Sequence, residues 1–549
     1  TGSPTMQPIP DIAARLGISE DNLIPYGRDK AKVDLSVLDR PRTRDGVGRL
    51  VLVSAITPTP AGEGKTTTTI GLGQALQRAG ESVCLALREP SMGPCFGIKG
   101  GGTGGGKSQL IPTADINMHL TGDLHAVTAA HNLLAAMVDN HLHFRSKPRL
   151  NIQRILWRRV MDMNDRSLRN IVVGLGGRGQ GTPRETGFDI TAASELMAIL
   201  CLSENFDDLR TRLARTLVGF DEDGNTVTAD DIGATGAMLA ILRDAIQPNL
   251  VQTMEGTPAL VHGGPFANIA HGCNSVLATK MALHTADWTI TEAGFGFDLG
   301  AEKFFDIKCA SAGLSPSAVV LVATVRALKM HGGVGLKELK TPNPAAVEAG
   351  LPNLAKHIES AQGFGVPVIV AINHFGADTD DEVAVIESFC EALGVPVAVS
   401  RHFAEGGAGA AALAEAVIAH AAPTAPPLSP MYRWSDPIPT KIENVAKRIY
   451  GADRVVYSNA ATNTMRLIKK LELTGLPICI AKTHRSLSDD PKRLGRPTGF
   501  PLNVQSIQIN AGAGLLVVLT GDIVRMPGLP RSPSALHFDV IDGCITGVW

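Results

Sequence analysis

A glycine-rich turn between an apolar run and a helical segment constrains the fold of this chain more than any other feature. Residues 50–56 are largely apolar, which is typical of a buried parallel strand, and residues 68–79 are expected to form a helix that ends before Gly80. Strand, glycine-rich turn, Gly-Lys-Thr and helix, in this order, are the parts of a phosphate-binding loop. The turn itself reads Thr57-Pro58-Thr59-Pro60-Ala61-Gly62-Glu63-Gly64-Lys65-Thr66-Thr67.

The loop carries the groups that a nucleoside triphosphate requires. Backbone N–H groups and the dipole at the start of the following helix favour an anion. Lys65 is expected to reach the terminal phosphates, and the Thr66 hydroxyl is expected to face a magnesium ion. The usual pattern has a glycine where this chain has Thr59, so a surface loop that matches by coincidence is the alternative. The candidate ATP-binding residues are Thr59, Pro60, Ala61, Gly62, Glu63, Gly64, Lys65, Thr66 and Thr67.

Strand-like and helix-like segments alternate from Leu50 onward. Strands are predicted over residues 82–87, 171–175, 287–291 and 318–324, with a helix over 191–202, whereas residues 6–45 are interpreted as a polar helical arm. The alternation predicts an α/β fold on a mostly parallel sheet. We expect three units: a large P-loop nucleotide-binding domain over 6–355, a second, smaller α/β domain over 356–430, and a C-terminal α+β domain over 431–549.

Two similar segments in the second unit predict a βαβ motif. Residues 365–375 and 394–403 both run from Gly-Val-Pro-Val to His-Phe, and the residues between them, 380–393, fit a helix. The crossover should be right-handed, so both strands run parallel and Phe375 and Phe403 lie at the same edge of the sheet. The proline-rich residues 422–430 are interpreted as a linker, and a helix is predicted near 440–450.

Arg88 follows the predicted strand over 82–87. If this strand is parallel to the one over 50–56, their carboxyl ends share an edge, and ligands bind outside that edge in open α/β sheets. A guanidinium there can hold a carboxylate or a phosphate with two parallel hydrogen bonds, and a surface arginine paired to an acid such as Glu89 is the alternative. The glycine-rich segment over 97–107 is either a linker or a mobile cover for this site.

Composition excludes several functional classes. A net charge of −2 gives no bulk attraction to nucleic acid, and no apolar run reaches the roughly 18 residues of a membrane span. The 8 cysteines are scattered without a Cys-x-x-Cys pair, which indicates reduced core residues and a cytoplasmic location.

A histidine-rich stretch has two interpretations. Core or hydrogen-bonding roles are the default, and a zinc site is the alternative. The stretch contains His119, His125, His131, His141 and His143.

From about residue 8 to Trp549, the chain resembles formate–tetrahydrofolate ligase, also called 10-formyltetrahydrofolate synthetase. The motifs are long and specific, and the phosphate-binding loop over 59–67 is one of them. The others are Arg88-Glu89-Pro90-Ser91 through Lys99-Gly100-Gly101, Asp115-Ile116-Asn117, Thr121-Gly122-Asp123, and the stretches over 131–136, 157–160, 187–191, 292–296, 301–308 and 526–530.

The resemblance implies a ligase, a carbon–nitrogen bond-forming enzyme of one-carbon metabolism. Its substrates would be ATP, formate and tetrahydrofolate, its products 10-formyltetrahydrofolate, ADP and phosphate, and its intermediate formyl phosphate. This route is chemically reasonable because formate resists a nucleophile until phosphorylation turns one of its oxygens into a leaving group. The resemblance also implies Mg²⁺, a monovalent cation such as K⁺ or NH₄⁺, and a homotetramer. In line with the charge and composition, no nucleic-acid or membrane partner is expected.

Site residues are carried over from the resemblance position by position. Lys65 and Arg88 match catalytic residues, with Arg88 holding formyl phosphate, and Thr66 would bind Mg²⁺ together with ATP. Phe375 and Phe403 match the pair that sandwiches the pterin ring, which would give the second unit a share of the folate pocket. Further residues that the resemblance implies are Phe295 near the acceptor and Glu89 and Asp123 near the monovalent cation.

The chain departs from the family pattern at several positions. Phe403 stands where tryptophan is common, and His374 stands where lysine or arginine is usual, which removes a fixed charge beside the folate. Phe297 replaces a small residue, which would narrow the pocket or adjust its adenine side. Lys107 and Ala114 replace a tyrosine and an acid. These departures concern folate affinity and folate chain length, not the type of reaction.

Two other functions are compatible with a P-loop. One is a ligase that activates a different carboxylate, and the other is a nucleotide-driven switch or partitioning ATPase, which would hydrolyse ATP without formate. The aromatic pair Phe375 and Phe403, together with Arg88, favours the formate ligase.

Overall fold

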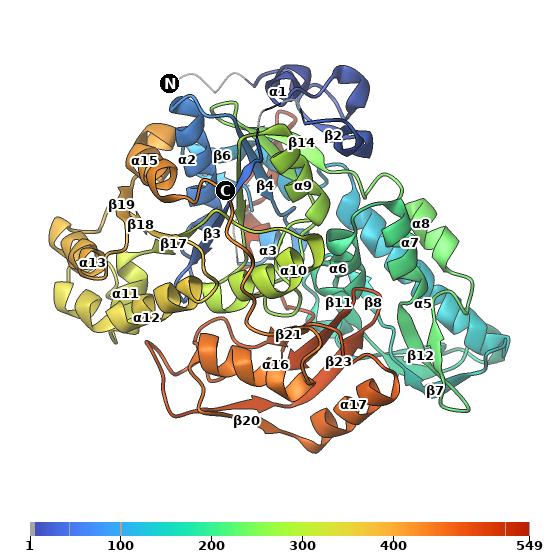
Figure 1. Cartoon of the computed structure of the whole chain (residues 1–549). Coiled ribbons are helices and arrows are strands. Elements are labelled where there is room, and N and C mark those ends of the chain that lie inside the picture. Colours follow the sequence, from blue (N-terminus) through green and yellow to red (C-terminus); the bar gives the residue numbers. More distant parts are fainter. Residues whose placement is uncertain (1–5, 43, 45, 99–101, 522, 548–549) are drawn as a thin grey trace.

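The computed structural model describes residues 6–42, 44, 46–98, 102–521 and 523–547. A 12-stranded sheet forms the centre of the molecule, and its main path runs β1-β2-β14-β15-β4-β16-β3-β17-β18-β19, with β6 on β14 and β5 on β6 (Figure 1). These strands are β1 Leu23–Pro25, β2 Ala31–Val33, β3 Arg49–Ala55, β4 Val83–Leu87, β5 Gly104–Gly105, β6 Ser108–Ile111, β14 Asn249–Thr253, β15 Pro258–Val261, β16 Trp288–Glu292, β17 Ala318–Ala323, β18 Val368–Asn373 and β19 Val397–Ser400.

The prediction of a mostly parallel α/β sheet is confirmed. All neighbours from β15 to β19 along the path pair in parallel. β14 is antiparallel to β15, β2 and β6. The interpretation of residues 6–45 as a helical arm is wrong in part: helix α1 (Ile9–Arg15) is followed by the β1–β2 hairpin, which extends the sheet because Ala31 and Val33 are buried.

Helices cover both faces of the sheet because successive strand residues point to opposite sides. On one side, Val51 and Val53 pack with apolar residues of α2 (Lys65–Arg78) and α15 (Ala411–His420). On the other side, Leu50 and Leu52 join the core formed with the opposite helices (Figure 1). These are α11 Val325–His331, α12 Pro344–Gln362 and α13 Asp380–Ala392.

The predicted βαβ motif is confirmed, and it belongs to the large sheet. β18, α13 and β19 follow one another, and β18 pairs in parallel with β19 on one side and β17 on the other. Residues 356–430 therefore have no separate sheet, and α12 crosses the expected boundary at 355/356. The reason is that β18 is apolar on both faces and buries them between helix layers like its neighbours. The division into units 6–355, 356–430 and 431–549 stays a prediction.

The predicted strand over 171–175 is short and lies outside the large sheet. It forms β9 (Ile171–Val173), which pairs antiparallel with β10 (Arg184–Thr186). Val172 is 54% exposed, so this apolar run is part of a surface hairpin and not a buried strand. The helix expected over 191–202 is present as α6 (Glu195–Leu202), after a short 3₁₀ turn.

A helical layer and small sheets complete the middle of the chain. The elements are α3 Met92–Phe96, α4 Thr113–Asn117, α5 Asp123–His143, β7 Leu150–Ile155, β8 Arg159–Met161, β11 Phe188–Ile190, α7 Phe206–Ala214, β12 Leu217–Asp221, β13 Thr226–Thr228, α8 Thr235–Ile241, α9 Val276–Thr285 and α10 Ala310–Ala312. Two π-helical turns, Phe297–Ala301 and Phe304–Cys309, follow β16.

The C-terminal residues form an α+β layer, drawn in orange and red at the bottom of Figure 1. Its three-stranded sheet has the order β21-β24-β23. As expected, residues 422–430 contain neither helix nor strand, and a helix follows them. The layer contains α16 Ile438–Val445 with a π-helical turn Ala446–Tyr450, β20 Arg454–Tyr457, α17 Asn459–Lys470, β21 Ile478–Ala481, β22 Pro501–Val504, β23 Ser506–Asn510 and β24 Leu515–Leu519. Outside this layer, α14 (His402–Glu405) follows β19 and precedes α15, and β25 (Asp539–Ile541) pairs with β26 (Cys544–Thr546) in a hairpin of their own.

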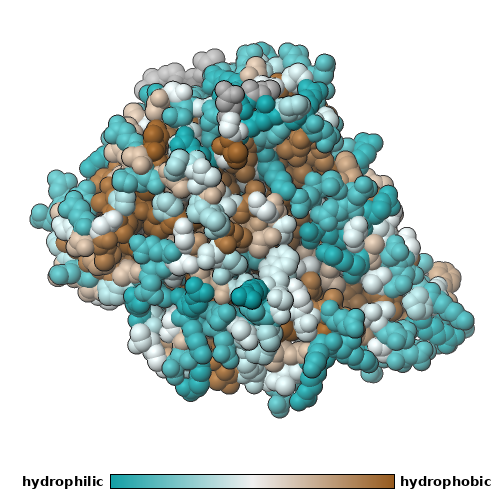
Figure 2. All heavy atoms as spheres, in the orientation of Figure 1, coloured by the Kyte–Doolittle hydropathy of each residue, from teal (hydrophilic) through white to brown (hydrophobic). Residues whose placement is uncertain are grey.

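The surface is mixed in polarity. Figure 2 shows hydrophilic side chains over most of the face in view, with apolar patches between them. One patch lies at the left, over the region where Figure 1 labels β17, β18 and α13. Within the described part of the chain, no helix combines the length and the apolar character needed to cross a membrane. The eight cysteines are unpaired, and all except Cys544 are buried, as expected for reduced core residues.

Candidate active site

The candidate site residues follow the parallel strands at a single edge of the sheet. Because parallel strands all end at the same edge, the order of the strands sets the order of the side chains along the rim. In sheet order the rim carries Arg88 after β4, Glu292 at the end of β16, the loop over 56–64 after β3, Thr324 and Arg326 after β17, Asn373 to Phe375 after β18, and Arg401 to Phe403 after β19.

The phosphate-binding loop has a backbone that requires glycine. Gly62 and Gly64 have φ angles of 76° and 72°, in the left-handed region. A Cβ atom on Gly64 would lie 2.5 Å from Nδ2 of Asn373, so the close approach of β18 also excludes a side chain. Helix α2 begins at Lys65, three residues earlier than predicted, and the Thr68 N–H donates to the Gly64 carbonyl. The loop therefore leads directly into the start of a helix, as an anion site requires.

Glu63 fastens the loop to neighbouring strands. Glu63 is 1% exposed, and its carboxylate accepts hydrogen bonds from the Thr59 N–H, at 2.6 Å, and from the Thr324 hydroxyl. Its carbonyl accepts a 3.0 Å hydrogen bond from Nδ2 of Asn373. Sequence reasoning counted Glu63 among the nucleotide-binding residues, and in the folded chain its carboxylate contacts protein groups that hold the loop in shape.

A carboxylate that sequence reasoning missed joins the loop to Arg88. The Thr66 hydroxyl donates a 2.9 Å hydrogen bond to Oε2 of Glu292, and Oε1 of Glu292 lies 3.7 Å from Nη2 of Arg88. Glu292 holds this position because β16 lies between β3 and β4. The expectation that Arg88 and the loop share an edge is confirmed, with one strand between them. A glutamate closing an apolar strand was the available sequence signal.

Arg88 is held loosely enough to meet a ligand. Its side chain is 25% exposed, and Nη1 donates to the carbonyl of Pro265 over 3.4 Å. A Cβ atom on Gly294 would lie 2.8 Å from Nη1, so glycine there makes room for the guanidinium. Among the described residues, the buried Nε of Arg88 has no hydrogen-bond acceptor. The guanidinium therefore retains donors that a small anion can use.

Glu89 and Asp123 lie together in a buried cluster with Lys32. Nζ of Lys32 is 2.7 Å from Oδ1 of Asp123, and Nδ2 of Asn249 donates to Oδ2 of Asp123 at 2.7 Å. Burial and the neighbouring Asp123 raise the pKa of Glu89 well above its ordinary value. Oε2 of Glu89 has no hydrogen-bond partner in the described part of the chain. Two carboxyl groups thus face one ammonium, which favours a proton or another cation at Glu89.

The three aromatic residues lie at different points of the rim. Phe295 has a φ angle of 57°, which is unusual for a residue other than glycine, and its ring stacks on His484 at 4.5 Å between centroids. The Phe375 ring lies under Arg326, whose guanidinium carbon is 4.1 Å from the ring centroid. Phe403 is 53% exposed. Phe375 and Phe403 follow adjacent strands as expected, but no ring contact joins them within the described residues, so their pterin-binding role stays a prediction.

The glycine-rich segment approaches Phe403. Its residues 99–101, including the motif Lys99-Gly100-Gly101, lie outside the described residues, and β5 and β6 form a hairpin after them. The Lys107 N–H donates a 2.9 Å hydrogen bond to the Phe403 carbonyl. A Cβ atom on Gly106 would lie 2.1 Å from that carbonyl oxygen. Contact with the backbone around Phe403 therefore explains why glycine is needed at 106.

Two of the three remaining departures, at positions 374 and 297, have local explanations. Nη1 of Arg401 lies 2.9 Å from Nδ1 of His374, so an arginine that directly follows the next strand, β19, brings a positive charge beside this histidine. Phe297 is fully buried, with its ring centroid 6.0 Å from that of Phe364, so it packs in the core and does not narrow a pocket. Ala114 lies in the short helix α4.

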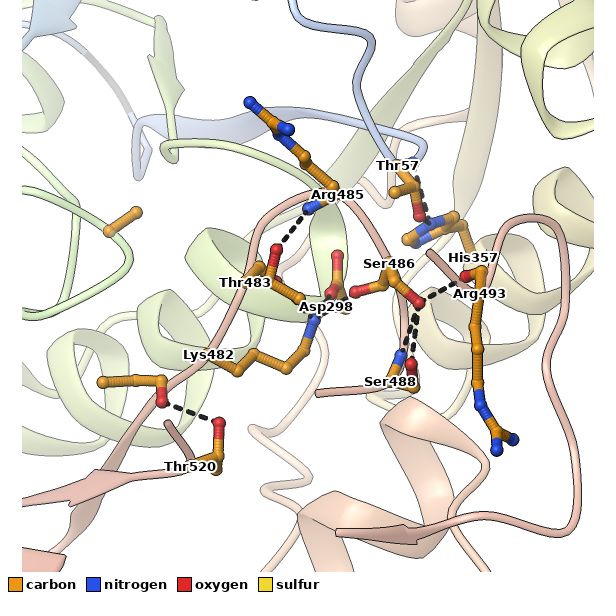
Figure 3. Close-up of polar contacts among 12 residues, drawn as sticks. Thr57, Asp298, His357, Lys482, Thr483, Arg485, Ser486, Ser488, Arg493 and Thr520 are labelled. Carbon is orange, nitrogen blue, oxygen red and sulfur yellow. Dashed lines mark hydrogen bonds and ion pairs between the residues drawn. The ribbon is translucent and has the colours of Figure 1, made fainter. Parts of the chain in front are cut away.

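A loop of the C-terminal layer, residues 482–496, reaches the base of the phosphate-binding loop, and sequence reasoning missed it. Figure 3 shows Lys482 against Asp298 and Thr57 against His357. Nζ of Lys482 and Oδ2 of Asp298 are 2.6 Å apart, and both side chains are buried. His331 joins the two segments, because its Nδ1 accepts from the Gly495 N–H and its Nε2 donates to the Thr57 carbonyl. The C-terminal layer therefore supports the site although it follows the sheet by a long stretch of chain.

The histidines of the stretch over 119–143 lie in no cluster of metal-binding side chains among the described residues. No group of three or more histidine, cysteine, aspartate or glutamate side chains with metal-binding geometry occurs in the part of the chain that the structure describes. His131 stacks on Trp157 at 4.1 Å, and burial lowers its pKa to about 3. His141 is hydrogen-bonded to the Pro148 carbonyl at 2.7 Å. For these two histidines the default core and hydrogen-bonding roles are confirmed.

Comparison with known proteins gives a consistent result over nearly the whole chain. The family model described as formate–tetrahydrofolate ligase matches residues 2–549. The formate–tetrahydrofolate ligase of Hyphomonas neptunium is 57% identical over 531 residues, which cover 97% of this chain and 95% of that protein. The proteins with the same name from Maricaulis maris and Paracoccus denitrificans are 55% and 54% identical, each over 99% of this chain and 98% of the relative.

Proposed function

Because the chain belongs to the formate–tetrahydrofolate ligase family, it is an ATP-dependent ligase, and we propose that Lys65 and Arg88 carry its chemistry. The reaction joins formate to tetrahydrofolate and gives 10-formyltetrahydrofolate, ADP and phosphate through formyl phosphate. The observation that carries the assignment of residues is the position of Glu292, which contacts both Thr66 of the phosphate-binding loop and Arg88.

Lys65 and the start of α2 would bind the phosphates of ATP. In the first step a formate oxygen attacks the γ-phosphorus, the bond to the bridging β,γ-oxygen breaks, and ADP leaves. Charge spreads over the transferring group, and Lys65 together with backbone N–H groups at the start of α2 would stabilise it. The left-handed glycines Gly62 and Gly64, which shape the loop, support this role.

Arg88 would hold the formate and then the formyl phosphate. Formate and the γ-phosphate are both anions, so their approach needs a cation between them. In the second step N10 of tetrahydrofolate attacks the formyl carbon, the carbon–oxygen bond to phosphate breaks, and N10 loses a proton. A planar guanidinium suits both anions because it can donate two parallel hydrogen bonds. The exposure of Arg88 and its unused Nε donor support this assignment.

Thr66 and Glu292 would hold the magnesium ion that accompanies ATP. A hydroxyl oxygen and a carboxylate oxygen 2.9 Å apart are hard ligands of the type that Mg²⁺ prefers, so these residues fit the ion. An ion held there would neutralise charge on the β- and γ-phosphates. Glu292 also lies close enough to Arg88 to orient the guanidinium.

Phe375 and Phe403 would bind the pterin ring, with Phe295 near the acceptor nitrogen. Aromatic stacking of this kind contributes about 0.5–1.5 kcal/mol for each contact beyond the burial of area. The parallel pairing of β18 and β19, which brings both residues to one edge, supports the slot. Arg401 beside His374 would restore the positive charge that a basic residue at 374 usually supplies for the folate.

Glu89 and Asp123 would form the site of the activating monovalent cation. The buried Oε2 of Glu89 and the excess of carboxylates over ammonium groups in the cluster with Lys32 support a cation there.

We further propose that the enzyme assembles as a homotetramer and works in the cytoplasm, as the family resemblance implies.

One assay tests the proposed function against its rivals. The protein is mixed with ATP, Mg²⁺ and tetrahydrofolate, with and without formate, and the formylated folate is followed by its absorbance after acid conversion. We expect product and ADP only when formate is present. ADP release without formate would indicate a switch or partitioning ATPase, and ADP release that requires a different carboxylic acid would indicate another carboxylate-activating ligase.

A further inference from the structure

Arg326 lies between the two halves of the candidate site. Along the rim the phosphate-binding loop follows β3, Arg326 follows β17, Phe375 follows β18 and Phe403 follows β19. The expected phosphate half and the expected pterin half therefore meet at this one side chain. Arg326 is 25% exposed and belongs to none of the motifs that identified the family.

Arg326 binds the phosphate-binding loop directly. Its Nη2 donates a hydrogen bond to the Gly62 carbonyl, and its Nε lies 3.7 Å from Oε2 of Glu63. The Thr324 hydroxyl fixes the base of this arrangement, because it donates to Glu63 and accepts from the Ala327 N–H at 3.1 Å. A movement of the guanidinium would therefore shift the peptide groups of residues 62 and 63, whose conformation shapes the anion site.

The same guanidinium covers one face of Phe375. Its central carbon lies 4.1 Å from the ring centroid, within the range of a cation–π contact. Arg326 reaches the ring from the β17 side, whereas Phe403 lies beyond β18 on the β19 side. A flat ligand between Phe375 and Phe403 would use the opposite ring face, which would stack the ligand, Phe375 and Arg326 in series.

From these contacts we infer that Arg326 is a positioning residue that couples occupancy of the pterin slot to the shape of the phosphate-binding loop. The inference rests on the proposed function, because it needs a folate ring on Phe375. A ligand that packs against Phe375 holds the guanidinium against Gly62 and Glu63. The phosphate-binding loop then already has the conformation that ATP requires before ATP binds. By linkage, ATP must then tighten tetrahydrofolate binding by the same factor.

The test measures this coupling without turnover. The dissociation constant of Mg²⁺-ATP is measured by calorimetry with and without saturating tetrahydrofolate, in the absence of formate, and the reciprocal titration is repeated with ATP saturating. In the unaltered chain we expect each ligand to tighten the other at least about fivefold. Arg326→Gln removes the positive charge and the planar guanidinium, so the coupling factor should fall to about one. Arg326→Lys should restore little of the coupling factor, because an ammonium cannot stack on the Phe375 ring and hydrogen-bond to the Gly62 carbonyl at the same time.

Controls separate coupling from misfolding and from loss of the folate site. Arg243→Gln changes an arginine that is 74% exposed and paired with its neighbour Asp244, and it should keep the coupling factor of the unaltered chain. The unfolding temperature of Arg326→Gln should stay within a few degrees of the unaltered chain. If the factor is already one in the unaltered chain, or persists in Arg326→Gln, the inference is wrong.

Phe375→Leu distinguishes failure of the inference from failure of the proposed folate site. If Phe375→Leu leaves the dissociation constant of tetrahydrofolate unchanged, the folate site is elsewhere and the proposed stacking role fails. If Phe375→Leu weakens tetrahydrofolate binding while Arg326→Gln retains full coupling, the folate site stands and only the role of Arg326 is overturned.

Discussion

The Thr66 hydroxyl, at the start of the helix that follows β3, donates a 2.9 Å hydrogen bond to Glu292 at the end of the neighbouring strand β16. Thr66 is the second residue of α2, and Glu292 is the last residue of β16. The same carboxylate lies 3.7 Å from Arg88 at the end of β4. One side chain therefore connects the residue expected to meet the metal with the residue expected to meet the formyl group.

Glu292→Gln should weaken the binding of the magnesium ion that the reaction requires. The amide keeps the size of the side chain but removes the charge that lies beside Arg88 and that we propose to bind Mg²⁺. We expect the Mg²⁺ concentration for half-maximal activity to rise about 10- to 100-fold, the range for lost metal-supporting groups. Thr66→Val should act in the same direction and Thr66→Ser should not, because serine keeps the hydroxyl. An unchanged magnesium dependence in both Glu292→Gln and Thr66→Val would refute the assignment.

Lys65→Ala should abolish formate-dependent ADP release. The substitution removes the only basic side chain of residues 57–67, which we propose to bind the terminal phosphates. ADP release is measured by a coupled assay with saturating formate and tetrahydrofolate. Lys447→Ala, at a lysine that is 51% exposed on the C-terminal layer, serves as the matched control and should keep full activity. Near-normal turnover in Lys65→Ala would contradict the phosphate-loop assignment.

Arg88→Ala should keep ATP binding and lose turnover. We expect kcat to fall by at least about 10²-fold, the scale for removal of one charge-stabilising donor. Arg88→Lys should recover only part of the loss because an ammonium cannot bind an anion with two parallel hydrogen bonds. ATP affinity is measured by calorimetry, and Arg454→Ala, at an arginine that is 64% exposed, is the control. If Arg88→Ala lost its ATP affinity together with its folded structure, a catalytic role would have no support.

Phe403→Ala should raise the KM for tetrahydrofolate more than the KM for ATP. The loss of one stacking contact corresponds to an increase of about two- to tenfold. Phe403→Trp should lower the folate KM because indole offers a larger stacking surface. Phe144→Ala, at a phenylalanine that is 69% exposed, is a suitable control for the removal of a surface ring. Equal effects of Phe403→Ala on both KM values would indicate a structural phenylalanine.

Glu195 should make the stability of the protein depend on pH. Burial raises its pKa from 4.5 to about 7, although the N–H groups of Gly512 and Ala513 donate to it. Between these values the folded chain keeps a proton that the unfolded chain releases. The stabilisation is therefore complete below pH 4.5 and is lost as the pH rises to about 7, by about 1.4 kcal/mol for each pH unit.

The measurement is the unfolding temperature at pH 5 and at pH 8. We expect a smaller fall between these pH values in Glu195→Gln than in the unaltered chain, because the amide does not titrate. Glu443→Gln, at a glutamate that is 45% exposed on α16, should leave the fall unchanged. The same fall in Glu195→Gln as in the unaltered chain would show that another group dominates in this range.

The local elements of the site were predictable because their signals lie within short segments. The apolar run, the glycines and Gly-Lys-Thr identify β3, the loop and α2, with an error of three residues at the start of the helix. The repeated Gly-Val-Pro-Val and His-Phe segments identify β18 and β19, since a βαβ crossover has one favoured hand. The resemblance supplied roles that the pattern alone does not, such as the pterin pair.

The sequence by itself determined that a phosphate-binding loop, Arg88 and the two strand-end phenylalanines belong to one edge of a parallel sheet. Only the tertiary structure decided that β16, which arrives some 200 residues after β4, enters between β4 and β3 and sets Glu292 between Arg88 and Thr66. It also decided that Arg326 spans the loop and Phe375. The physical reason is that the composition of a strand indicates whether the strand is buried, but not which strands lie beside it. The order of strands depends on how helices from distant segments of the chain pack against the apolar faces of the sheet.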